Sequence, residues 1–192
     1  MVQPIQSLIT ERLRIDPFTM EDAEGFLALY GDPGVMKYLP VPPLADIEAA
    51  RFLLATYVAR IETGEQFRWA IRTHDDDTII GALKLDTPNN KERASEVGYM
   101  LAKEAWGKGY ATEAMHALAG YAFTALNRHY LEALIYADNR ASRKVVERLG
   151  FKLEGYFREH EWSEEEERFL DDCVYTLLEQ EYRGNGIHPE SP

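Results

Sequence analysis

Residues 94–123 constrain the fold of this 192-residue chain more than any other stretch. The segment "ASEVGYMLA" alternates like a strand, and "AWGKGYATEA" then places two glycines one residue apart at the start of a helical pattern that runs to Phe123. A glycine-rich turn between strand and helix is typical of a phosphate site, since backbone amides and the helix dipole both favour an anion there. The stretch predicts a phosphorylated ligand, with a plain tight turn as the alternative.

The apolar pattern changes period several times along the chain, as expected for mixed strands and helices. Thr19 and Asp22 resemble a capping box, and the prolines of "YLPVPPLAD" predict an irregular connection that could flank a site. The predicted strands cover 12–18, 66–73, 79–86, 94–102, 130–137, 151–157 and 167–178, and the predicted helices cover about 19–30, 46–61, 109–123 and 139–150. The length is typical of a single domain, which we expect over residues 1–184 with a loose tail at 185–192.

Charge and cysteine content disfavour several classes of protein. A net charge of -12 argues against nucleic-acid binding, which needs clustered Lys and Arg, and weakly favours cationic partners. The single cysteine, Cys173, cannot form an internal disulfide. The N-terminus has no leader pattern and the longest apolar run, at 52–59, is too short to cross a bilayer. We expect a cytoplasmic protein without membrane contact and, because its five histidines are scattered, without a metal site.

Two common nucleotide-binding motifs fit the glycine pair poorly. A Walker loop needs Ser or Thr after Gly-Lys, but Gly109 follows Lys108 here. A dinucleotide fingerprint needs a third glycine where the chain has Thr112. A nucleotide-binding protein stays open as an alternative, and it predicts that ATP or NAD stabilises the fold more than CoA does.

Two separated segments carry a family resemblance. "EVGYMLAKEAWGKGYATEA" and, about thirty residues later, "ADNRASRKVVERLGFKLEG" resemble the GNAT superfamily of acetyl-CoA-dependent N-acetyltransferases, and most of all its branch that acetylates ribosomal-protein N-termini (RimJ/RimL-like). The resemblance implies an α/β fold with a mixed, mostly antiparallel sheet of about seven strands, splayed at the fourth and flanked by about four helices. It also implies acetyl transfer from acetyl-CoA to a primary amine.

The resemblance assigns the glycine turn to the CoA pyrophosphate. The motif falls on Trp106, Gly107, Lys108, Gly109, Tyr110 and Ala111, and Thr112 follows it. Trp106 departs from the usual Gln or Arg, and tryptophan there is common in the ribosomal-protein branch. On the preceding strand, Gly98 would form a bulge that opens a slot lined by Tyr99, Met100 and Leu101.

The resemblance also implies groups near the thioester sulfur. Asn139 would contact the pantetheine arm and Ser142 would lie near the sulfur, although Asn139 is equally suited to capping the helix that follows it. Many family members place a tyrosine that acts as the general acid where this chain has Val146. We therefore expect Ser142 to donate to the leaving thiolate, with Tyr136 and Tyr156 in reserve.

Two carboxylates are candidates for the general base. Glu96 resembles a strand position from which a carboxylate often acts through water, and Glu161 matches a glutamate that faces the acceptor amine in this branch. His160 should point away from Glu161 if the segment is extended, which suggests a surface histidine. The sequence leaves open the acceptor (a ribosomal-protein N-terminus, a polyamine, an amino acid or an antibiotic), a homodimer, and a non-catalytic module that senses acyl-CoA.

Overall fold

The computed structural model describes residues 5–63, 66–87, 91–163 and 166–184. Over these ranges eight strands form one sheet in the order β1-β2-β3-β4-β5-β6-β8-β7. The strands are β1 (Leu8–Ile9), β2 (Leu13–Pro17), β3 (Gln66–Thr73), β4 (Asp76–Asp86), β5 (Ala94–Leu101), β6 (Tyr130–Tyr136), β7 (Lys152–Ser163) and β8 (Arg168–Leu178). The helices are α1 (Ala23–Tyr30), α2 (Pro33–Met36), α3 (Ile47–Thr63), α4 (Tyr110–Thr124), α5 (Arg140–Arg148) and α6 (Glu179–Gly184), with short 3-10 turns at Met20–Asp22 and Lys103–Ala105.

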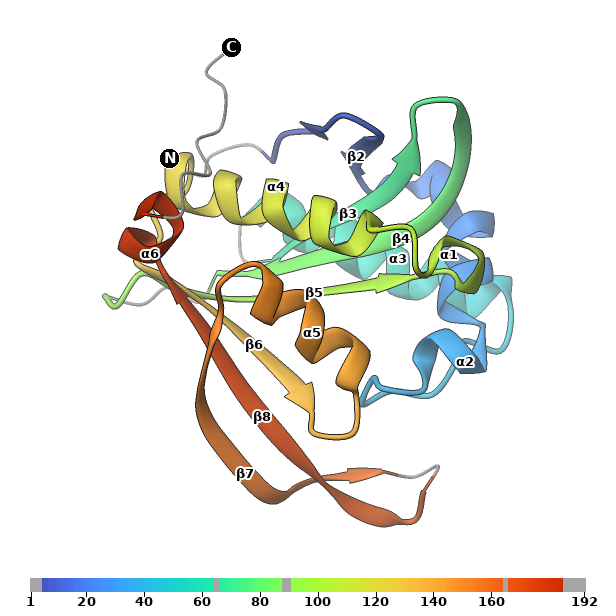
Figure 1. Cartoon of the computed structure of the whole chain (residues 1–192). Coiled ribbons are helices and arrows are strands. Elements are labelled where there is room, and N and C mark those ends of the chain that lie inside the picture. Colours follow the sequence, from blue (N-terminus) through green and yellow to red (C-terminus); the bar gives the residue numbers. More distant parts are fainter. Residues whose placement is uncertain (1–4, 64–65, 88–90, 164–165, 185–192) are drawn as a thin grey trace.

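The central strands are buried on both faces because helices cover both. In β3, Trp69 and Ile71 belong to the core cluster on the side of α4 and α5, whereas Ala70 between them belongs to the cluster formed with α1 and α3. This is the period-2 alternation of a strand, and Figure 1 shows α4 and α5 on the near side of the sheet. The two charged residues in the buried part of β3 form ion pairs: Arg68 with Asp86, and Arg72 with Asp22.

The sheet splits between β5 and β6, the one parallel neighbour pair in the described sheet. They pair only over Ala94–Glu96 and Tyr130–Glu132, and then diverge (Figure 1) while β6 stays paired with β8 along its whole length. The predicted splay is therefore confirmed, but a bulge at Gly98 is wrong. The register of β4 with β5 runs without a break through Gly98, so the slot opens because β6 turns away.

The predicted elements are found with a few differences. Asp46 caps α3 by accepting from the amide of Ala49 at 2.9 Å, and Asp22 accepts from the amide of Thr19 at 2.8 Å. β1, α2 and α6 are too short to give a periodic signal and were not predicted. β7 continues six residues past its predicted end at 157, because a bulge after Phe157 lets pairing with β8 resume at Glu161. The predicted tail at 185–192 lies outside the described residues.

Candidate active site

The splay between β5 and β6 holds a cavity of about 360 Å³. Its lining draws on β3 to β8, on helices α1, α3, α4 and α5, and on the proline-containing connection Tyr38–Val41, which was expected to flank a site. The predicted site residues in this lining are Glu96, Tyr99, Met100, Asn139, Ser142 and Glu161. Leu101 is instead 7% exposed in the core, and residues 106–112 form a separate turn outside the cavity wall.

The glycine turn has a backbone that only glycine adopts easily. Gly107 and Gly109 have φ of +74° and +83°, both in the left-handed region, and Gly109 is the N-cap of α4. No side chain caps this helix start, and a Cβ added at Gly107 would meet nothing within 4 Å. The first amides of α4 therefore have no side-chain cap, which suits an anion such as the pyrophosphate expected at this turn.

The connection between β1 and β2 anchors the turn. Arg12 donates from Nη1 to the carbonyl of Lys108 at 3.0 Å, pairs with Glu113 in the first turn of α4, and lies 4.8 Å over the ring of Tyr110. Thr10 also donates to Glu113, at 2.6 Å. Burial alone raises the pKa of Glu113, but these hydrogen bonds hold it below the usual glutamate value.

Trp106 braces the other side of the turn. Its Nε1 donates to the carbonyl of Leu101 at 2.8 Å, while its side chain is about half exposed. The tryptophan therefore ties the turn to the end of β5 and leaves its ring partly open to solvent.

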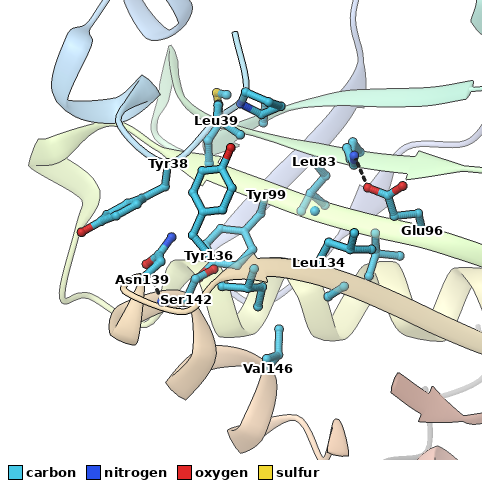
Figure 2. A pocket seen from close by; sticks show the side chains of 18 of the residues that line it. Tyr38, Leu39, Leu83, Glu96, Tyr99, Leu134, Tyr136, Asn139, Ser142 and Val146 are labelled. Carbon is cyan, nitrogen blue, oxygen red and sulfur yellow. Dashed lines mark hydrogen bonds and ion pairs between the residues drawn. The ribbon is translucent and has the colours of Figure 1, made fainter. Parts of the chain in front are cut away.

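Ser142 lies in the cavity at the first turn of α5. Asn139 caps this helix, because its Oδ1 accepts from the amide of Ser142 at 3.1 Å. The Ser142 hydroxyl is hydrogen-bonded to the Tyr99 hydroxyl at 3.1 Å, and Figure 2 shows the Tyr99 ring reaching from β5 to Ser142. Burial raises the pKa of Tyr99, which keeps the phenol protonated. Val146 is buried at the position where many relatives were expected to carry a tyrosine.

Glu96 lies at the closed end of the splay, far from Ser142 (Figure 2). Its carboxylate forms an ion pair with the Lys84 ammonium across β4 and β5 at 2.5 Å. The Lys84 ammonium thus occupies the Glu96 carboxylate on this side.

Glu161, Asp172 and Tyr136 meet at the other wall of the cavity. Tyr136 and Asp172 are cross-strand partners in β6 and β8, and Glu161 of β7 lies close enough for its charge to act on the Tyr136 hydroxyl. Burial, and then the charges of Glu161 and Asp172, raise the pKa of Tyr136 strongly. His160 pairs with Asp172, whereas Tyr156 is half exposed and bonded to Asp171 outside the cavity.

Comparison with known proteins identifies the family. Residues 12–152 match the model described as the acetyltransferase (GNAT) domain. The chain belongs to the GNAT acetyltransferase family. It is 32% identical over 180 residues to an uncharacterized N-acetyltransferase, p20, of Bacillus licheniformis, covering 94% of this chain and all of that relative.

Two solved structures of named enzymes share the GNAT fold. Spermidine N-acetyltransferase from Vibrio cholerae, in complex with CoA and spermine, superposes with a TM-score of 0.80 at 22% identity over 91% of this chain and 99% of that chain. Ribosomal-protein-S5-alanine acetyltransferase from Vibrio fischeri gives 0.80 at 21% over 93% and 99%. At these identities the likeness shows the fold, so the predicted GNAT fold is confirmed and the ribosomal-protein branch is not singled out.

This GNAT protein is an acetyl-CoA-dependent N-acetyltransferase. None of the helices in the described ranges is both long and apolar enough to cross a bilayer. The same ranges hold no group of three or more His, Cys, Asp or Glu side chains that could bind a metal ion.

Several residues of the site were missed by sequence reasoning. Arg12 and Glu113 are about a hundred positions apart, and the pairing of Asp172 with Tyr136 depends on the register of β6 with β8. Tyr99 was predicted as a wall of the slot, but its hydrogen bond to the Ser142 hydroxyl was not predicted. A polar residue inside an apolar strand, as in "FLDDCVYTLL", was the available signal for Asp172.

Proposed function

We propose that this GNAT protein acetylates a primary amine that binds at the Glu161 wall of the cavity, with Glu161 as the group that takes the amine proton. The observation that carries the proposal is the placement of Glu161 beside Tyr136 and Asp172, facing the cavity from the wall opposite β5. Two carboxylates at this wall attract an ammonium, and an ionised carboxylate can accept a proton from it.

The leaving group is handled at the other wall. Ser142 and Tyr99 form a hydroxyl pair, so one can donate to the thiolate while the other supports it. The Gly107–Gly109 turn and the start of α4 hold the pyrophosphate, and Asn139 holds the pantetheine arm as well as capping α5. Acetyl-CoA supplies the activated acyl group, which the amine attacks directly.

In this scheme the base is Glu161 and not Glu96. Glu96 is held by Lys84 at the closed end of the splay, whereas Glu161 lines the cavity beside Tyr136. A general base must lie within reach of the proton that it takes, and Glu161 lies at the wall where the amine is proposed to bind.

The α-amine of a ribosomal-protein N-terminus is the first acceptor we propose, on the resemblance of the Trp106 turn to that branch. A polyamine is the second candidate, favoured by the acidic wall at Glu161 and Asp172 and by a net charge of -12. A small primary amine of another kind, such as an amino acid or an antibiotic, is the remaining alternative.

Thiol release from acetyl-CoA with a panel of amines tests the proposal. The panel contains short peptides with free and blocked N-termini, spermidine, free amino acids and an aminoglycoside. We expect release with a free amine and none with its blocked counterpart. If acetyl-CoA stabilises the protein but no amine, including those in a cell extract examined by mass spectrometry, becomes acetylated, the catalytic proposal is wrong.

A further inference from the structure

Asp172 is a buried carboxylate with a partner on each side. It is 2% exposed and lines the cavity, where it faces Tyr136. On its other side, Oδ2 lies 2.7 Å from Nδ1 of His160, whose side chain is 47% exposed. A buried carboxylate without partners is strongly unfavourable, so this residue is stabilised by a group that itself contacts water.

A local break in β7 creates this arrangement. Phe157 pairs with Asp172 and Glu161 pairs with Leu170, so residues 158–160 lie opposite one residue of β8. Glu159 has a left-handed φ of +50°, and its amide donates to Asp171 at 2.7 Å. As expected for a surface histidine, His160 is exposed and is absent from the cavity lining, although the bulge brings its ring to Asp172. The bulge lays His160 over Asp172 while Glu161 enters the cavity.

The reaction itself creates a need for a proton path. An ammonium acceptor R–NH3⁺ and acetyl-S-CoA give R–NH–CO–CH3, CoA–SH and one H⁺. The N–C bond forms, the C–S bond breaks, and of the two protons that leave nitrogen one ends on sulfur. The other is taken up by Glu161, which lines the cavity and is partly exposed, and it must pass from there to solvent.

We propose that the Asp172–His160 pair carries this proton from the Glu161 and Tyr136 end of the cavity to solvent. The inference rests on the proposed function. The ionisable groups that interact with this path are Tyr136 on β6, Glu161 on β7, and Cys173 beside Asp172 on β8. His160 touches neither the acyl group nor the amine in this scheme, so it is a positioning and relay residue.

Chemical rescue separates a relay from a structural contact. His160→Ala should lower turnover by about tenfold, below the roughly hundredfold typical of a group that itself takes the proton. Added imidazole should restore much of the loss, while the KM for the amine stays near the wild-type value. His160→Gln, which can still donate to Asp172 but cannot relay a proton and fills the space, should be slow and should not be rescued.

His74→Ala is the matched control, because His74 is exposed and bonded to the carbonyl of Thr10 outside the cavity. It and the wild type should be insensitive to imidazole. Normal turnover by both His160 variants, or a loss in His160→Ala that imidazole does not relieve, overturns the relay. Inactivity of the wild type on every acceptor overturns the proposed function, and the relay with it.

Discussion

The two ends of the proposed acetyl-CoA site are built in different ways. The turn at 106–112 comes from one contiguous stretch and presents backbone amides, with two left-handed glycines fixing its shape. The proposed catalytic end assembles side chains from β5, β6, α5, β7 and β8, which are separated by up to seventy or so residues. A backbone site is therefore readable from local sequence, whereas a side-chain site depends on how strands are ordered in the sheet.

The largest expected effect belongs to the catalytic end. Glu161→Gln should lower turnover by at least about a hundredfold, because an amide cannot accept the amine proton. Affinity for acetyl-CoA, measured by melting shift, should be unchanged. Glu154→Gln, an exposed glutamate on the same strand, should turn over like the wild type. Equal losses in the two variants would remove the special role of Glu161.

A change in the glycine turn should have the opposite effect and weaken the binding of acetyl-CoA. At a hundred times its dissociation constant, acetyl-CoA should stabilise the wild type by roughly 2.7 kcal/mol. Gly109→Val should lose most of that gain, because valine disfavours a φ of +83° and its side chain blocks the backbone. Gly155→Ala, where an added Cβ makes ordinary contact 3.6 Å from Val174, should keep it. A Gly109→Val protein that folds and is stabilised normally would refute a backbone-built site.

The Ser142–Tyr99 hydroxyl pair provides a second test of the catalytic end. Ser142→Ala and Tyr99→Phe should each lower turnover by about tenfold, since the surviving hydroxyl can still donate to the thiolate. The double variant should lose more than the sum of the two free-energy changes, because no hydroxyl remains. Steady-state kinetics on all four proteins measures the coupling, and strictly additive losses would mean that the two hydroxyls do not substitute for each other.

Glu113 tests the anchoring of the turn through pH. Its pKa is lowered in the folded state, so its contribution is present above the unfolded pKa and is lost as the pH falls through the folded pKa. Glu113→Gln should lower the free energy of unfolding by about 1 kcal/mol at neutral pH and by much less in acid. Chemical denaturation at both pH values checks this, and a difference independent of pH would contradict the ionic account.

The smallest effect is expected at Glu96. Glu96→Gln removes one member of a partly exposed ion pair, which is worth about 1 kcal/mol or less, and turnover should fall by no more than about fivefold. A loss as large as that of Glu161→Gln would indicate that Glu96 on β5 acts as the base.

Much of this architecture could be predicted from the sequence. Alternation in "QFRWAIRT" and "IIGALKLD" predicted strands, and the glycine pair predicted a turn before a helix, each within a few residues of its observed place. Gly98 shows the limit. A glycine in a strand suggests a bulge, but the break lies in β6, whose partner choice is a long-range property.

The sequence by itself determined the order of the elements, the shape of the Gly107–Gly109 turn and the helix cap at Asn139, because these depend on residues within a few positions of one another. Only the tertiary structure decided that Tyr99 meets Ser142, that Lys84 holds Glu96, and that Asp172 lies between Tyr136 and His160. Those contacts follow from sheet order, register and one bulge in β7, which arise from the burial of the whole core and leave no local trace in the chain.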